Sequence, residues 1–153
     1  MNGFLAVGMH DEKGERYGYD LHSVASGESS LYIRKSPAKG WFRHGRFSFS
    51  KEGQSFGEKI LRGISSENTE LAVIDELGPV ELKGKGWAAE VERLLNECRC
   101  VHLWVVRKAL LKRMIRQWNI GDVLLVDVAE DRVADAAEAI LSFVRDSSKH
   151  RND

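Results

Sequence analysis

The chain has 153 residues, 42% of them hydrophobic, which is enough for one domain with a substantial core. Basic and acidic residues number 23 each, so the formal net charge is zero. This balance argues against nucleic acid or an anionic membrane as the main partner. No apolar run approaches the ~20 residues of a membrane span, and the first residues lack the basic start of a signal peptide. We therefore expect a cytoplasmic protein.

Short strands are predicted in the first 34 residues. They are expected at 3–8, 16–23 and 29–34. The connections between them are rich in Gly, Asp and Ser, which favours an antiparallel meander. A loop is predicted at 35–40. A helix is predicted from Ser50, as its N-cap, to about Arg62.

Strands and helices alternate over the rest of the chain. Buried strands are predicted at 71–75, 100–106 and 123–128, and helices at 87–97, 108–118 and 131–145. This alternation is typical of right-handed crossovers and a parallel sheet. We therefore expect one domain over residues 1–145, followed by a polar tail at 146–153.

Two adjacent carboxylates, Asp75 and Glu76, follow the apolar strand that begins at Leu71. They are expected at the carboxyl end of a central strand, where open α/β sheets bind ligands. Adjacent residues on a strand point to opposite faces, so the two acids can have different roles. Asp75 can hold Mg²⁺, directly or through water, and Glu76 can orient or deprotonate an attacking water. The alternative is an acidic strand end that merely begins a loop.

Three arginines are candidates for contacts with phosphate. Arg107 follows the strand 100–106, so we expect it at the same edge of the sheet, where it can steady phosphate charge. Alternatively, it opens a solvated cationic helix. Arg43 and Arg46 lie among aromatic residues at 41–49, and guanidinium groups and aromatic rings together can bind a base and its phosphate. The alternative for these two is a packed loop.

Other residues that often form sites are interpreted as structural. Cys98 and Cys100 flank a single arginine, which indicates reduced thiols at a helix-to-strand junction rather than a zinc site. His102 is interpreted as a core histidine. The tryptophans Trp87, Trp104 and Trp118 fall at core positions of predicted elements.

Several blocks, in order, resemble the small P-loop nucleoside-triphosphatases, the family of the thermophilic and cancer-related enzymes. The blocks are Gly3-Phe4, Gly14-Glu-Arg-Tyr-Gly-Tyr-Asp-Leu21, Gly45-Arg-Phe-Ser-Phe49 and, most specifically, Ile74-Asp-Glu-Leu-Gly-Pro-Val-Glu-Leu-Lys83. The resemblance implies an α/β, P-loop-like three-layer sandwich with a mostly parallel sheet and an N-terminal antiparallel meander. It implies Mg²⁺-dependent hydrolysis of a nucleoside triphosphate to the diphosphate. Asp75 then matches the Walker B magnesium acid and Glu76 the candidate catalytic acid, while Glu81 has no assigned role.

One part of the family pattern is missing from the sequence. Members open with a strand, a Gly-x-x-x-x-Gly-Lys-Ser/Thr loop and a helix, but no Gly-Lys-Ser or Gly-Lys-Thr triplet occurs here. The segment Lys83-Gly-Lys-Gly86 has neither the hydroxyl for magnesium nor the strand-to-helix context. We therefore expect that the first βα unit, roughly 25 to 30 residues, is missing from this chain. Nucleotide binding by the chain alone should be weak or absent.

The missing unit is also expected to leave backbone groups unpaired beside residues 71–75. There are three alternatives: the unit has been removed at the start of this chain, another polypeptide supplies it, or the remaining strands close the gap in a non-hydrolysing relative. The alternative function is a non-catalytic interaction module, in which the open edge accepts a strand from a partner or a second copy. A nucleic-acid-binding domain built on the Arg43 region and the 107–116 helix is less favoured, because the charges elsewhere cancel.

Overall fold

The computed structural model describes residues 1–36 and 38–149. The predicted loop at 35–40 and the predicted tail at 146–153 therefore lie partly outside the described residues. The chain divides into two compact units, Met1–Leu111 and Lys112–Asp153. The expectation of a single domain over 1–145 stays a prediction.

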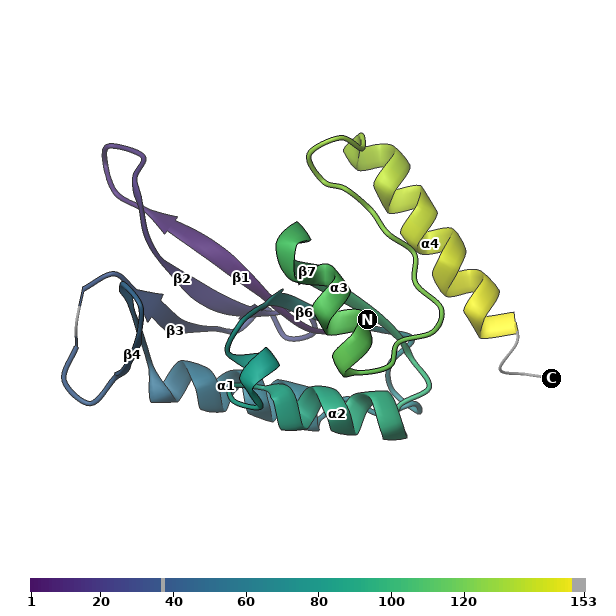
Figure 1. The fold of residues 1–153 in the computed structure, drawn as a ribbon, viewed down its shortest axis with the longest axis horizontal. Helices are drawn as coiled ribbons and strands as arrows, with labels where there is room; N and C mark the ends of the chain where they lie inside the picture. The colour runs from purple at the N-terminus through teal and green to yellow at the C-terminus, as the bar shows by residue number, and fades with distance from the viewer. Residues whose placement is uncertain (37, 150–153) are drawn as a thin grey trace. The chain divides into compact units, whose positions relative to one another are not determined.

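A seven-stranded sheet forms the centre of the first unit (Figure 1). Its strands are β1 (Asn2–His10), β2 (Arg16–Ser23), β3 (Ser29–Arg34), β4 (Phe42–His44), β5 (Phe47–Phe49), β6 (Leu71–Leu77) and β7 (Val101–Val106). Their order across the sheet is β4-β5-β3-β2-β1-β6-β7. The first three strands lie within two residues of their predicted bounds, because turn-forming residues mark both ends of each strand.

The sheet is mixed, with more antiparallel than parallel pairs. The strands β1, β2 and β3 form the predicted antiparallel meander, and β5 extends it antiparallel to β3 and β4. The parallel pairs are β1 with β6 and β6 with β7. The α/β class is confirmed. The sheet is less parallel than predicted, because hairpin-connected strands contribute more of it than strands joined by helices.

The strand β6 is paired on both sides. It lies between β1 and β7, and Phe4 of β1 is opposite Ile74 of β6. The expected row of unpaired groups beside residues 71–75 is therefore wrong, because β1 occupies that position. The free edge nearest to β6 is instead the far side of β7, which pairs with no other strand of the described residues.

The helix α1 (Lys51–Arg62) packs against β1, β2 and β3 and against α2 (Ala88–Glu97), and the two helices run along the same side of the sheet in Figure 1. Ser50 is the N-cap, as predicted, and its Oγ accepts a hydrogen bond from Gly53 N at 3.0 Å. Gly53 lets α1 approach β3 closely, because a Cβ there would collide with the backbone of Leu31 and Tyr32. The helix therefore holds β3 and the following hairpin in place.

Aromatic rings connect the helices to the sheet. Trp87, at the start of α2, is 1% exposed, and its ring centroid lies 4.6 Å from that of Phe4 and 5.0 Å from that of Tyr32. Tyr32 in turn lies 5.6 Å from Phe49. The core position predicted for Trp87 is confirmed, whereas Trp104 and Trp118 are half-buried.

The C-terminal part of the chain contains α3 (Leu111–Gln117), which follows a 3₁₀ turn at Lys108–Leu110, and α4 (Val133–Lys149). The predicted buried strand at 123–128 is wrong: the segment is not a strand, and Leu125 and Val128 are 60% and 87% exposed. An apolar run is a strand only where a neighbour completes its hydrogen bonds, and the described sheet ends at β7. Residues 146–149 are helical rather than part of a tail.

The thiols of Cys98 and Cys100 lie between the end of α2 and the start of β7, as predicted. Both are buried, and their sulfurs are 2.7 Å apart. Burial lowers the pKa of the neighbouring His102, and a hydrogen bond with the backbone of Cys98 opposes that shift. Among the described residues, no three His, Cys, Asp or Glu side chains form a potential metal cluster.

None of the helices in the described ranges combines the length and the hydropathy needed to cross a membrane.

Candidate active site

The acids Asp75 and Glu76 form a bulge at the carboxyl end of β6. Ile74 pairs with Trp104 and Leu77 with Val106, and the register shifts between these pairs. Glu76 has φ 63°, in the left-handed region that non-glycine residues rarely adopt. Bulges and strained residues re-aim side chains and are frequent at active sites. The simple alternation expected for a regular strand is therefore broken at these two residues.

The Asp75 carboxylate connects β6 to β1. Its Oδ2 accepts a hydrogen bond from Ala6 N at 2.9 Å, just beyond the last paired residues of the two strands. Burial raises the pKa of Asp75, while hydrogen bonds from the backbone of Ala6 and Glu76 oppose that shift. A half-buried carboxylate at a strand end suits a hard cation, but one acid supplies too few ligands. Phosphate oxygens and water would have to complete the shell.

The phenol of Tyr19, on β2, is within the electrostatic influence of both acids and of two arginines. Burial raises the pKa of its phenol, the carboxylates of Glu76 and Asp75 raise it further, and the charges of Arg16 and Arg107 lower it. The Arg16 Cζ lies 4.9 Å from the centre of the Tyr19 ring. Three of the predicted site residues, Asp75, Glu76 and Arg107, lie at the same edge of the sheet, because β6 and β7 are parallel and Leu77 pairs with Val106.

The contribution of β2 to this cluster was not predicted. Arg16 and Tyr19 come from a strand that precedes Asp75 by more than 50 residues. Their only signal in the sequence is the block Gly14 to Leu21, which shares a pattern with the resembled family. Arg107 leaves β7 at the predicted edge, because Val106 pairs with Leu77 at the end of β6.

The other two predicted arginines lie in the hairpin of β4 and β5. Arg46 is exposed, and its Cζ lies 5.1 Å from the centre of the Phe47 ring. Arg43 is also exposed and lines a cavity between this hairpin and the loop that follows β6. Their predicted contact with a nucleotide stays a prediction.

Glu81 holds the loop between β6 and α2. It is 3% exposed, its Oε2 accepts a hydrogen bond from Gly78 N at 2.9 Å, and its Oε1 accepts one from Trp87 N at 3.4 Å. Gly86 lets the loop close over this carboxylate, because a Cβ there would collide with Oε1. Glu81 is therefore a structural clamp that fixes the chain immediately after Asp75 and Glu76.

Comparisons with known proteins show the family of the chain and the similarity of its fold. A sequence model of the family described as NTPase matches residues 1–141, so the chain belongs to this family of nucleoside-triphosphatases. Nucleoside-triphosphatase THEP1 of Archaeoglobus fulgidus is 29% identical over 131 residues, which cover 84% of this chain and 74% of that protein. The solution structure of a human cancer-related nucleoside triphosphatase is similar in fold, with a TM-score of 0.63 and 22% identity. That similarity covers 93% of this chain and 82% of the human one.

The strain at Glu76 leads to a test on stability. Glu76→Gly should raise the free energy of unfolding by about 1 kcal/mol, because glycine adopts φ 63° without the cost that other residues incur. The matched variant Glu92→Gly, at an exposed helical position of α2, should lower it by about 1 kcal/mol. Urea unfolding of both variants measures the two values. Equal destabilisation in both would show that Glu76 is not strained.

Proposed function

We propose that this domain performs Mg²⁺-dependent hydrolysis of a nucleoside triphosphate to the diphosphate and phosphate, at the carboxyl end of β6. The observation that carries the proposal is the bulge at Asp75 and the left-handed Glu76, at the sheet edge where Arg107 follows β7. Membership in the NTPase family and the name of the archaeal relative support it.

The proposed roles follow from the position of each side chain. Asp75 would hold the metal, which when bound neutralises charge on the phosphates. Glu76, which is exposed, would orient the attacking water and accept its proton as the bond to the leaving diphosphate breaks. Arg107 would stabilise negative charge on the phosphoryl group in transfer.

The phosphate cradle is the part that this sequence does not supply. In P-loop enzymes, the backbone amides and the lysine of a Gly-Lys-Ser/Thr loop bind the β- and γ-phosphates. This sequence contains no such loop, so these contacts are missing. We propose that a strand and loop supplied from outside these 153 residues pair with the far side of β7. Among the described strands, this is the free edge nearest to Asp75 and Glu76.

The unmodified chain provides the first test. With Mg²⁺ and ATP or GTP, we expect weak or absent nucleotide binding at Asp75 and phosphate release no faster than in buffer. Calorimetry and a phosphate assay measure the two quantities. Tight Mg²⁺-dependent binding with turnover by the unmodified chain would overturn the proposal that the cradle is missing.

The second candidate function is a non-catalytic interaction module, and the free edge of β7 favours it. This edge is apolar in sequence, Val105 is 45% exposed, and the far side of β7 pairs with no strand of the described residues. Such an edge can pair with the same edge of a second copy. Light scattering should then report a dimer that Val105→Lys weakens. A monomer at all concentrations would count against this function.

A further inference from the structure

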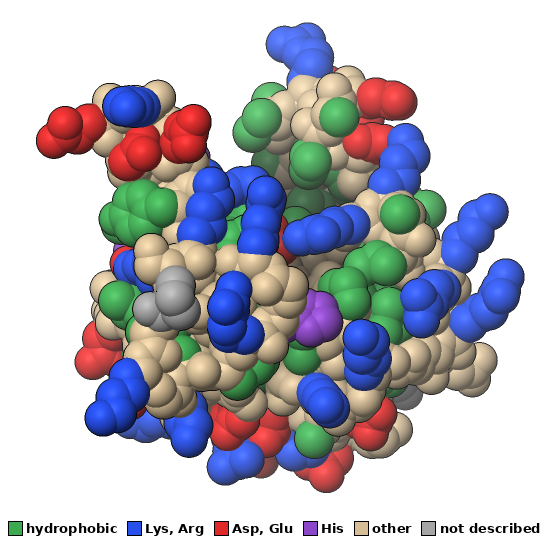
Figure 2. Space-filling view, turned by 60° about the vertical axis from the view of Figure 1, so that its left-hand side comes forward, with side chains coloured by type: hydrophobic (Ala, Val, Ile, Leu, Met, Phe, Trp, Pro, Cys, Tyr) green, Lys and Arg blue, Asp and Glu red, His purple; other side chains and the backbone are tan. Residues whose placement is uncertain are grey.

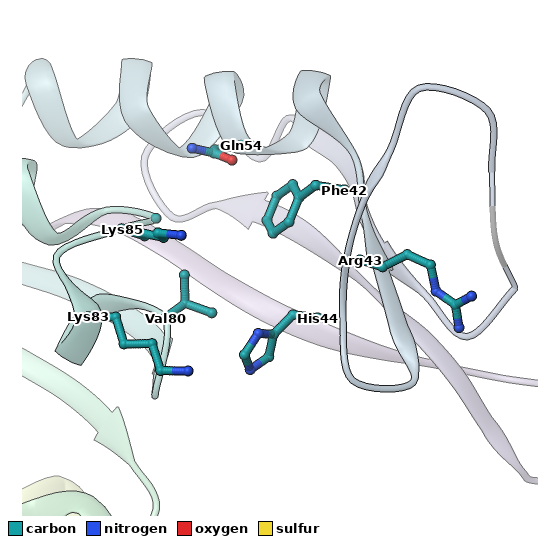
Figure 3. A pocket seen from close by; sticks show the side chains of 8 residues that line it. Phe42, Arg43, His44, Gln54, Val80, Lys83 and Lys85 are labelled. Carbon is teal, nitrogen blue, oxygen red and sulfur yellow. The ribbon is translucent and has the colours of Figure 1, made fainter.

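A cavity of about 340 Å³ lies between β4, α1 and the loop that follows β6. Figure 3 shows Phe42 and His44 extending from the hairpin toward Val80 and Lys83 on the opposite wall, with Gln54 on the helical side. Lys85 and Gly86 complete the loop wall. The guanidinium group of Arg43 extends away from this space in Figure 3.

Hydrogen bonds hold the loop after β6, which forms one wall of the cavity. Besides the two hydrogen bonds to Glu81, Lys85 N donates to Val80 O at 3.2 Å and Gly84 N donates to Glu81 O at 2.9 Å. The loop therefore turns back on itself and presents Lys83 and Lys85 from a fixed backbone. A cavity with fixed walls and a volume in the range of ligand sites does not need to form on binding.

The charge of the cavity is positive. Its lining includes the basic side chains of Lys83 and Lys85, and none of the lining residues is acidic. The whole chain has no net charge, so this concentration of cations is local. Basic side chains are also prominent on the face of the molecule in Figure 2, with a histidine among them. Clusters of lysine and arginine favour phosphate groups.

The aromatic ring of Phe42 lines the cavity and is packed against other rings on its far side. Phe42 is 37% exposed, and its ring stacks on Phe49 with centroids 4.7 Å apart and an angle of 15°. Phe49 lies against Tyr32, which packs against Trp87 in the core. The Phe42 ring is thus held from behind while part of its surface stays accessible. A nucleobase can stack on such a ring whatever its identity, because every base has a flat aromatic face.

We propose that this cavity binds a single nucleotide, with its base on Phe42 and its phosphates at His44, Lys83 and Lys85, without a metal ion. The volume fits one nucleotide rather than a longer strand. The proposal rests on the proposed function for the class of ligand, but it involves neither Asp75 nor Glu76. We expect a dissociation constant on the order of 0.1–1 mM, because the cavity has no cradle of backbone amides.

The test is an NMR titration of the full chain with ATP in the presence of EDTA. The expected result is a shift of the amide signals at 42–44 and 83–86. Phe42→Ala and Lys83→Ala should each weaken binding at least about fivefold, a change of roughly 1 kcal/mol. Asp75→Asn should leave the affinity unchanged, so the result is independent of the metal-dependent reaction.

Matched controls keep the test specific. Tyr17→Ala removes an aromatic ring with the same 37% exposure, and Lys59→Ala removes an exposed lysine of α1; neither should change binding. Inorganic triphosphate should bind more weakly than ATP, because it lacks a base. Equal affinity for both, unchanged binding in Phe42→Ala, or much tighter binding of a single-stranded oligonucleotide would overturn the proposal. The amide spectrum of each variant shows whether it is folded.

Discussion

Glu76→Gln should reduce phosphate release by about 10²–10⁴-fold in a version of this protein that has been given a phosphate loop. The loop is supplied by joining a strand, a Gly-x-x-x-x-Gly-Lys-Thr loop and a helix to Met1 through a flexible linker. Magnesium-dependent hydrolysis should then appear, because the free edge of β7 can accept the strand one position away from β6, which carries Asp75 and Glu76. Glutamine keeps the size of Glu76 but cannot accept the proton of the attacking water.

Two further variants of the same fusion test whether the loss of activity is specific to the candidate active site. Asp75→Asn should also abolish the magnesium-dependent rate, since an amide is a poor substitute for a carboxylate on Mg²⁺. Glu92→Gln, on the exposed face of α2, should leave the rate unchanged. A fusion that hydrolyses ATP equally well with Gln at position 76 would show that Glu76 has no part in the chemistry.

Glu81→Ala should lower the free energy of unfolding by about 2–5 kcal/mol, because it leaves the amides of Gly78 and Trp87 without their acceptor. The loss should be greater than for Glu92→Ala, in which no buried partner is exposed. Urea unfolding measures both. If the two variants are equally stable, the hydrogen bonds of Glu81 do not stabilise the loop between β6 and α2.

The pH dependence of stability tests the same carboxylate. Burial raises the pKa of Glu81 above its usual value of 4.5, while hydrogen bonds from the backbone at Gly78, Glu81 and Trp87 oppose that shift. The folded state therefore binds the proton more tightly than the unfolded state. The contribution of Glu81 to stability is greatest below pH 4.5 and decreases as the pH rises through the folded pKa. The difference in free energy of unfolding between the wild type and Glu81→Gln should therefore decrease as the pH rises from 4.5 through the folded pKa. A difference that does not change with pH would contradict this prediction.

Much of the first unit was predictable, because its signals are local. Turn residues bound the strands of the meander, Ser50 caps α1, and the apolar run before Asp75 becomes a strand buried between two neighbours. The placement of Arg107 at the edge of Asp75 follows from the parallel pairing of β6 and β7. Each of these depends on a few adjacent residues or on one rule of sheet topology.

The errors concern interactions between distant segments. Whether 123–128 is a strand depends on a neighbour to pair with, which its own apolar sequence cannot indicate. The position of β1 beside β6, and of Tyr19 near both acids, depends on the strand order of the whole sheet. The left-handed conformation of Glu76 had no signal, because glutamate is not a residue that favours it.

The most direct test of the account is to locate the metal site with Mn²⁺, which broadens the NMR signals of nearby amides. In the fusion that carries a phosphate loop, with ATP present to supply phosphate oxygens, low concentrations of Mn²⁺ should first broaden the signals of Ala6, whose amide donates to Asp75, and of Glu76. The broadening should disappear in Asp75→Asn. Broadening that begins elsewhere, or that persists in this variant, would contradict the assignment of Asp75 as the metal ligand and of the carboxyl end of β6 as the active site.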